Sequence, residues 1–399
     1  MDRADRYALG VDSGGTGVRV ALTPVRADGT VTYASPPVVS DLPVPTGPGG
    51  IDADALAGRL VPAARELLAR ADGGGLAAVC VGAAGMATLG DGLRARLPGV
   101  LAEEFGAVRV ALAADAVTAY AGALGQRPGA VVAAGTGLIG VGTDLTGWRR
   151  ADGWGHLLGD CGGGAWIGRA GLEAALRAHD GRAGGSAALL RRLEAVFGSA
   201  ARLPGLLYPR TDRPAVLASF APEVAACAAE GDPVAGDILR EAARHIAQTA
   251  AAVCPDRGAG APPESRAGAA REAGAGVTPA PGTGETPGPV AGLTPKFHAR
   301  TTPEAGAGVI PDPGTGATPK VRFGAAPEVA LTGGLLRMGE PLLVPLHEQF
   351  AEVLPHARRV GALGSPLDGA LLIAAALATD TLSFPHDPGM LYVSGHQTR

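Results

Sequence analysis

Short apolar runs alternate with longer segments of mixed polarity in the first part of the chain, and this pattern predicts an α/β fold. We expect the apolar runs to form β-strands at 7–11, 18–23, 77–83 and 108–114. Helices are expected over 54–71, 91–105 and 115–124. In the first helix Leu56, Leu60 and Leu67 lie on one apolar stripe at helical spacing, which supports the helix.

The pattern changes after residue 142, where helical periodicity dominates before strands return. The helices expected there cover 164–180, 184–198, 214–229 and 233–253. Further on we expect a strand and glycine turn at 328–334, a helix over 340–353, a short strand at 357–361 and a helix over 366–378. Residues 381–399 are polar and should form a flexible tail.

Residues 255–326 have a different composition from their surroundings. They hold 12 of the 33 prolines of the chain, which opposes both helices and central strands. The sequence of 272–287 recurs over 304–319, with few large apolar residues. Such a repeat cannot bury enough apolar surface to offset its ordering entropy, so we expect a disordered insertion in a surface loop.

The length of 399 residues is sufficient for two buried cores. We therefore expect two α/β domains separated near residue 116. The N-terminal domain would span 1–116, and the C-terminal domain would combine 117–254 with 327–380. The insertion 255–326 and the tail 381–399 would belong to neither core.

Charge and cysteine content exclude several classes of protein. The chain has 34 basic and 38 acidic residues without a basic run, which argues against a nucleic-acid partner. Its apolar stretches are too short to span a membrane, and its first residues lack a hydrophobic signal core. Its 4 scattered cysteines argue against zinc, iron–sulfur and disulfide frameworks and fit the cytoplasm. A homodimer is left open.

Two segments share one design, in which a β-rich run, a glycine-threonine-glycine turn and a second β-rich run follow one another. They cover 7–22 and 130–142. Glycines in such turns let the backbone approach a ligand, and successive N–H groups can bind phosphate oxygens. An ordinary hairpin is the alternative. The candidate phosphate-binding residues are Gly14, Gly15, Thr16, Gly135, Thr136 and Gly137.

Two further features point to a nucleotide. Asp12 closes the first strand beside the first glycine turn, where a carboxylate can orient Mg²⁺ while the turn holds the phosphates of ATP. The alternative is an Asx turn that only shapes the hairpin. Gly333 and Gly334 stand at a strand-to-helix junction and would let the backbone pack against adenine or ribose.

Two more carboxylates are candidates for the chemistry itself. Asp115 ends an apolar strand and begins a helix, so it could act as a general base on a substrate hydroxyl or simply cap the helix. Asp160 closes the glycine-rich sequence GWGHLLGD at 153–160 and could accept hydrogen bonds from sugar hydroxyls or cap the next helix. Gly153 and Trp154 of the same loop are candidate sugar contacts.

In order, the motifs are DSGGTG at 12–17, AADA at 113–116, AAGTG at 133–137, GWGHLLGD, WIGR at 166–169 and LTGG at 331–334. Together they resemble the BadF/BadG/BcrA/BcrD-type ATPases of the actin/hexokinase/Hsp70 superfamily, and most closely their N-acetylglucosamine kinase branch. The resemblance spans most of 7–379 outside the insertion.

The resemblance implies two ribonuclease-H-like α/β domains hinged around an ATP cleft. It also implies that Asp115 is the catalytic base and that Asp160 and Thr136 contact the sugar. Asp12, with the first glycine turn, would bind MgATP. The expected activity is therefore ATP-dependent phosphorylation of the 6-hydroxyl of N-acetylglucosamine or a close relative.

The sequence departs from this family at the sugar site. Cys161-Gly162-Gly163 stands where members carry an acidic residue followed by Gly-Ser, and Leu138 replaces a small polar residue. The loop 40–48 lacks an asparagine found near the acetamido group in related kinases. These changes bear on sugar identity rather than on phosphoryl transfer.

Two other functions are weighed against the kinase. Dehydratase-activating ATPases of the same family need cluster-binding cysteines beside the second glycine turn, where this chain has none. A non-catalytic sugar- or nucleotide-binding regulator would not need Asp12 and Asp115, which are both retained.

Overall fold

The computed structural model describes residues 6–14, 17–42, 44–47, 50–71, 73–106, 109–255 and 326–394. These residues form a six-stranded sheet, a five-stranded sheet, a small two-stranded ribbon and the helices that cover the sheets. The described part of the chain belongs to one compact unit. Of the predicted insertion, 256–325 lie outside the described residues, as do Gly15 and Thr16 of the first glycine turn.

The first sheet is built around the strand that carries Asp12. Across the sheet the strands are β13 (Leu391–Val393), β7 (Arg109–Ala114), β6 (Gly75–Ala83), β1 (Arg6–Gly14), β2 (Gly17–Pro24) and β3 (Val38–Ser40). β1, β2 and β3 are antiparallel neighbours, whereas β6 and β7 run parallel to β1. The parallel strands end together, so Asp12 and the residue after β7, Asp115, are brought to one edge.

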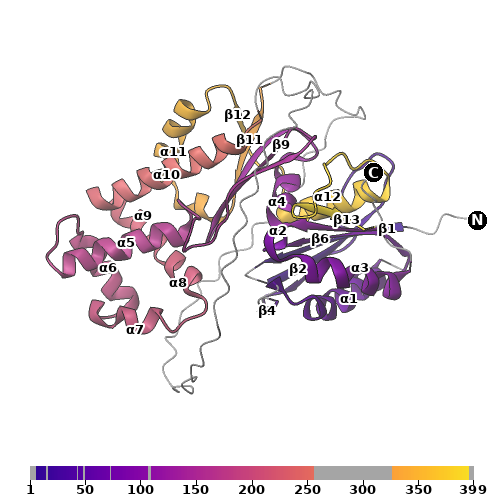
Figure 1. Cartoon of the computed structure of the whole chain (residues 1–399), viewed down its shortest axis with the longest axis horizontal. Helices are drawn as coiled ribbons and strands as arrows, with labels where there is room; N and C mark the ends of the chain where they lie inside the picture. Colours follow the sequence, from indigo (N-terminus) through magenta and orange to yellow (C-terminus); the bar gives the residue numbers. More distant parts are fainter. Residues whose placement is uncertain are drawn as a thin grey trace, which may run out of the picture. The chain divides into compact units, whose positions relative to one another are not determined.

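Helices cover both faces of the first sheet, as Figure 1 shows. On one face lie α1 (Ala53–Arg70) and α3 (Asp91–Phe105), and on the other α4 (Asp115–Leu124) and α12 (Pro366–Ala378). The α4–α12 contact depends on small residues. A Cβ placed on Gly369 would lie 1.9 Å from the carbonyl oxygen of Thr118, and one on Gly122 would lie 2.0 Å from that of Ser365. Glycine therefore lets the two helix backbones approach each other closely.

The second sheet repeats the order of the first. Its strands are, in sequence across the sheet, β10 (Trp148–Asp152), β9 (Leu138–Thr143), β8 (Gly129–Ala134), β11 (Glu328–Thr332) and β12 (Arg358–Val360). β8, β9 and β10 are antiparallel, and β11 and β12 run parallel to β8. Three antiparallel strands followed by two parallel ones thus occur twice. This is the ribonuclease-H-like topology, and the predicted fold class is confirmed.

Helices also pack on the second sheet and extend beyond it. They are α5 (Gly164–His179), α6 (Ala187–Phe197), α7 (Leu203–Leu207), α8 (Arg213–Ser219), α9 (Ala221–Ala229), α10 (Pro233–Val253) and α11 (Glu340–Val353). α10 packs on β9, where a Cβ on Gly142 would lie 1.9 Å from the carbonyl oxygen of Val253. The predicted helix over 214–229 is two helices, because Pro222 begins the second and cannot donate an interior helical hydrogen bond.

Two predictions about the C-terminal third are wrong. The predicted C-terminal domain includes α12, but the buried face of this helix packs on β1, β6 and α4, and most of its buried residues belong to the first hydrophobic core. The expected flexible tail contains β13, which pairs antiparallel with β7 and buries Leu391 and Val393. The short apolar sequence Leu-Tyr-Val finds its partner strand far away in the chain, which local polarity does not reveal. Residues 395–399 lie outside the described residues.

Candidate active site

A cavity of about 710 Å³ opens where the ends of the two sheets meet. Its walls bring together residues from the ends of β1, β7, β8 and β11, from α4, and from the loop after β10. Of the predicted site residues, eight line it: Asp12, Gly14, Asp115, Gly135, Gly137, Gly153, Asp160 and Gly333. Thr136, Trp154 and Gly334 are not part of the lining. The volume is in the range of small-molecule sites.

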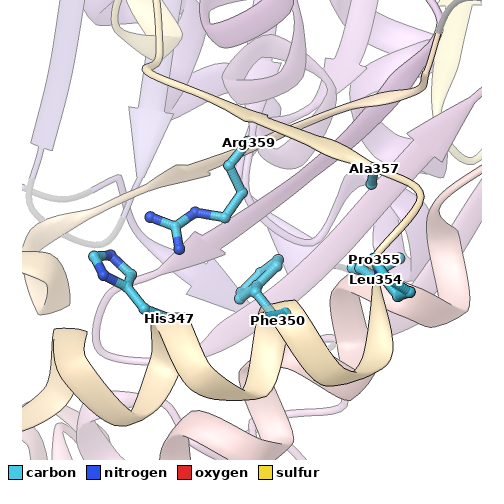
Figure 2. Close-up of a pocket in the computed structure, with 7 residues that line it drawn as sticks. His347, Phe350, Leu354, Pro355, Ala357 and Arg359 are labelled. Atoms are coloured by element: carbon cyan, nitrogen blue, oxygen red, sulfur yellow. The ribbon is translucent and has the colours of Figure 1, made fainter.

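A second hollow of about 400 Å³ lies on α11 beside the approach to β12. Figure 2 shows Arg359 extending from the strand towards the helix that carries His347 and Phe350. The guanidinium carbon of Arg359 lies 5.7 Å from the centroid of the Phe350 ring. This hollow contains none of the site residues predicted from the sequence. The larger cavity is therefore the candidate active site.

Asp12 lies in β1 directly opposite Arg19 of β2. Arg19 Nη1 approaches Asp12 Oδ2 to 3.5 Å, with the arginine about half exposed and the carboxylate largely buried. Burial raises the pKa of Asp12, and the positive charge of Arg19 partly opposes this. A buried carboxylate at the end of a strand, with only one long ion pair, can accept a further cationic partner.

Asp115 is the first residue of α4 and follows β7 directly. The N-cap position belongs to Ala114, so the interpretation of Asp115 as an N-cap is wrong. Asp115 Oδ1 accepts one hydrogen bond of 2.9 Å, from the backbone N–H of Ala116. Burial raises the pKa of Asp115 to about 6; the Ala116 N–H lowers it, Asp12 raises it and Arg150 lowers it. A carboxylate with this pKa is suited to accept a proton near neutral pH.

The second glycine turn, between β8 and β9, is fixed by the start of α5. Gly164 N–H donates to the carbonyl of Gly135 and Ala165 N–H to that of Thr136, both at 2.8 Å. Within the turn, Gly135 N–H donates to Gly137 at 3.0 Å. The turn is therefore held firmly beside the cavity. A Cβ on Gly135 would meet no atom within 4 Å, which leaves this side of the turn open to a ligand.

Asp160 is held in a backbone conformation with φ of 55°. Its Oδ1 accepts a hydrogen bond of 3.0 Å from Gly155 N–H, across the loop. Its Oδ2 faces the second glycine turn, where a Cβ on Gly137 would lie only 2.3 Å away. Burial raises the pKa of Asp160, and the Gly155 N–H opposes the shift. Asp160 thus joins the loop to the second glycine turn.

Gly333 lies at the end of β11 with φ of 106°. A Cβ there would lie 2.2 Å from the carbonyl oxygen of Ala134, the last residue of β8. Glycine is required at this position both for the backbone conformation and for the close approach of the two strands. Gly334 lies next to the cavity-lining residue but outside the lining itself.

Two residues of β10 that the sequence analysis did not single out also belong to the site. The carboxylate of Asp152 accepts hydrogen bonds from Asp160 N–H at 2.6 Å and Cys161 N–H at 3.0 Å. Arg150 lines the cavity, and Arg150 Nη2 donates to the carbonyl of Gly153 at 2.6 Å. The sequence does contain a sign of this role: Asp152 and Gly153 form an Asp-Gly pair, which is typical of a turn in which the aspartate accepts hydrogen bonds from the backbone.

The remaining loop side chains are exposed. Trp154 is 64% exposed and lies against Arg150, whereas Leu157 and Leu158 are 77% and 86% exposed. Trp154 is therefore at the rim of the cavity rather than in its wall. Among the described residues, no helix is both long and apolar enough to cross a membrane, and no three metal-binding side chains form a cluster.

Comparison with known proteins identifies the family. The family model of the BadF/BadG/BcrA/BcrD ATPases matches residues 9–263. The chain belongs to this ATPase family.

The chain is similar in sequence to an N-acetylmuramic acid/N-acetylglucosamine kinase of Clostridium acetobutylicum. It is 35% identical over 143 residues, which are 35% of this chain and 46% of that protein. The match thus spans about half the length of the relative.

Solved structures agree with the fold. A proposed N-acetylglucosamine kinase of Chromobacterium violaceum superposes with a TM-score of 0.58 at 24% identity, covering 94% of this chain and all 100% of that one. A proposed N-acetylglucosamine kinase of Porphyromonas gingivalis gives a TM-score of 0.57 at 14% identity, covering 94% and 99%. At these identities the likeness shows the fold of the ATPase family member and not its substrate.

Proposed function

We propose that this ATPase family member is an ATP-dependent amino-sugar kinase that phosphorylates the 6-hydroxyl of N-acetylglucosamine or a close relative. The main support is that three carboxylates, Asp12, Asp115 and Asp160, line one cavity together with glycines of both phosphate-type turns. Sugar phosphorylation needs a base, a ligand for the cation, and a group that accepts hydrogen bonds from the sugar hydroxyls. The partial match to an N-acetylmuramic acid/N-acetylglucosamine kinase supports the same substrate class.

The walls of the cavity are compatible with MgATP. A Cβ on Gly14 or Gly135 would meet no atom within 4 Å, so the backbone at these two glycines is open to phosphate oxygens. The Asp12 carboxylate is the hard oxygen ligand that Mg²⁺ prefers, directly or through water. When bound, MgATP supplies the phosphoryl group that is transferred. Gly15 and Thr16 stay candidates from the sequence.

In this proposal each carboxylate has a separate task. Asp115 accepts the proton of the 6-hydroxyl as that oxygen attacks the γ-phosphorus of ATP and ADP leaves. Asp160, held by Gly155, accepts hydrogen bonds from ring hydroxyls and so fixes the sugar. The glycine turns let the backbone approach the phosphates, and the bound sugar would displace water that could otherwise hydrolyse ATP. The protein contributes to phosphoryl transfer mainly by positioning the sugar and ATP and by neutralising charge on the phosphates.

Leu138 and Cys161 bear on the choice of sugar. Leu138 is an apolar residue in the cavity lining, which suits an acetamido methyl group better than a charged group. Cys161 is neutral where related kinases carry an acidic residue that would attract a free ammonium. We therefore expect N-acetylglucosamine to be preferred over glucosamine by at least about tenfold in kcat/KM, a difference of about 1.4 kcal/mol.

A coupled assay of ATP turnover tests this proposal, with N-acetylglucosamine, N-acetylmuramic acid, glucosamine and glucose as acceptors and mass spectrometry of the product. Sugar-dependent turnover that yields a 6-phosphate supports the kinase. Equal turnover of glucosamine and N-acetylglucosamine contradicts the expected preference for N-acetylglucosamine but agrees with the proposed kinase activity. ATP hydrolysis that no sugar stimulates favours the activator-type ATPase, and nucleotide binding without turnover favours a regulator. Cytoplasmic location and a homodimer stay predictions from the sequence.

A further inference from the structure

The end of β10 and the start of the glycine-rich loop form one hydrogen-bonded unit. Asp152, the last residue of β10, accepts hydrogen bonds from the backbone N–H groups of Asp160 and Cys161, at 2.6 and 3.0 Å. These residues are eight and nine positions further along the chain. The Asp152 carboxylate therefore closes the loop 153–160 by joining its two ends.

The loop is shaped around this carboxylate. A Cβ on Gly159 would lie 2.4 Å from Asp152 Oδ1, so a larger residue at this position would clash with the carboxylate. Asp152 itself has φ of 59°, in the left-handed region that non-glycine residues seldom adopt. Aspartate tolerates this conformation better than most residues, but it still carries strain. A strained backbone conformation persists only where the surrounding contacts hold it in place. At Asp152 these contacts belong to the proposed sugar site.

Arg150 holds the other side of the same loop. Arg150 Nε donates to the carbonyl of Asp152 at 3.2 Å and Nη2 to that of Gly153 at 2.6 Å. Its guanidinium also lies against the ring of Trp154. The first residues of the loop are thus fixed by the side chain of Arg150, and its last residues by the carboxylate of Asp152.

We propose that Asp152 is a positioning residue for sugar binding, which acts by holding Asp160 in the orientation that receives the ring hydroxyls. This inference rests on the proposed function and extends it to a residue outside the cavity lining. Asp160 uses Oδ1 to accept from Gly155 N–H, and its Oδ2 faces the second glycine turn. With the backbone N–H of Asp160 released, this arrangement would no longer be enforced.

The charge of Asp152 disfavours the ionised form of Asp160, which separates the two effects that Asp152 could have. Burial raises the pKa of Asp160, and the neighbouring charge of Asp152 raises it further, while His156 lowers it. Removing the charge of Asp152 would therefore make Asp160 more readily ionised. If sugar binding is nevertheless lost, the cause is the lost hydrogen bonds and not the lost charge.

The test compares Asp152→Gly, Asp152→Asn and the control Asp144→Gly. Glycine adopts a φ of 59° without strain, so Asp152→Gly removes the carboxylate, with its charge and both acceptor oxygens, without adding backbone strain. Asparagine also tolerates this conformation and keeps one acceptor oxygen. Asp144 is matched in chemistry: at the opposite end of the β9–β10 hairpin it accepts from Thr146 N–H at 2.8 Å and Gly147 N–H at 3.2 Å, away from the cavity.

We expect Asp152→Gly to raise the KM for N-acetylglucosamine by about tenfold to a hundredfold, as the loss of charge-assisted hydrogen bonds implies. The KM for ATP should stay within about twofold, Asp152→Asn should be intermediate, and Asp144→Gly should leave both values within about twofold. Calorimetric titration with N-acetylglucosamine alone should show the same order of affinities. Thermal melting of each variant checks that it is folded.

The outcomes distinguish this inference from the proposed function. If the wild type phosphorylates N-acetylglucosamine and Asp152→Gly keeps its sugar KM, the inference is wrong and the kinase stands. Equal loss of ATP and sugar affinity, or the same loss in Asp144→Gly, shows a merely structural role. If the wild type binds sugar without phosphorylating it, the kinase is wrong, and the order of sugar affinities still decides the role of Asp152. A wild type that neither binds nor phosphorylates the sugar overturns both.

Discussion

The guanidinium carbon of Arg150 lies 4.8 Å from the centroid of the Trp154 ring, and the same positive charge lowers the pKa of Asp115. One cation therefore contacts the loop that carries Asp160 and acts on the proposed base. Among the described residues Arg150 forms no ion pair with a carboxylate within 4.0 Å, so its charge is available to the cavity that it lines.

Arg150→Met should shift the acid limb of the pH profile of kcat to higher pH. The positive charge stabilises ionised Asp115, so its removal raises the pKa of that carboxyl above about 6 and leaves less base at neutral pH. Profiles from pH 5 to 9 at saturating sugar measure the shift. Arg150→Lys should keep most of the wild-type profile. Arg149→Met is the control, because adjacent strand residues point to opposite faces and Arg149 donates to the carbonyl of Cys254. An unshifted limb in Arg150→Met would contradict the prediction.

Asp115→Asn should lower kcat by at least about a hundredfold, since general-base catalysis typically contributes 10²–10⁴. The same change should raise the free energy of unfolding. Folding raises the pKa of Asp115 from 3.8 to about 6, so the ionised group opposes folding, and stability is lost as pH rises towards 6. At pH 8 the variant should gain up to about 3 kcal/mol, and less at pH 5. Denaturant titrations at both pH values measure this. Near-wild-type turnover would make Asp115 a structural residue.

Gly137→Ala should weaken sugar binding with little effect on folding. The added Cβ would lie 2.3 Å from Asp160 Oδ2, and the carboxylate must move to make room. We expect the KM for sugar to rise about tenfold or more, because displacement of a positioning group by about 1 Å can cost as much as 10²-fold. Gly147→Ala, in the β9–β10 turn with no atom within 4 Å of its Cβ, is the matched control. Equal kinetics in the two variants would rule out the proposed contact of Asp160 with sugar.

Gly333→Ala should destabilise the protein and weaken ATP binding together. Its Cβ would clash with the carbonyl of Ala134 at 2.2 Å, and its φ of 106° is strained for alanine. We expect a loss of at least about 3 kcal/mol in unfolding free energy and a higher KM for ATP. Gly339→Ala separates the two causes, because Gly339 has φ of 73° with no atom within 4 Å of its Cβ. That control should lose about 1–2 kcal/mol and keep its ATP affinity. Similar losses in both variants would show that the Ala134 contact is unimportant.

Local pattern was sufficient for much of the fold. The apolar runs around Asp12 and Asp115 are strands that end at the cavity, and the helix over 366–378 has the predicted bounds. Residues placed by contacts far apart in the chain were not predictable in this way. The packing of α12 on α4 depends on Gly122 and Gly369, whose roles emerge only when the two helices meet.

The site shows the same division. Asp12, Asp115 and Asp160 stand at ends of strands or in a glycine-rich loop. The sequence pattern predicts that residues at such positions can contact a ligand. Arg150 and Asp152 lie on a short strand of mixed polarity that the pattern did not predict. Their contribution depends on hydrogen bonds to backbone groups across the loop, which side-chain type alone does not specify.

The position of β13 bears on how the protein avoids association with other chains. A strand at the edge of a sheet exposes N–H and C=O groups that pair readily with a foreign strand. β7 would be such an edge, and it is the strand that leads into Asp115. Because β13 pairs with Ala111, Leu112 and Ala113, this edge is already occupied. The three-residue β13 thus covers the edge of the strand that leads to the cavity and leaves a shorter edge in its place.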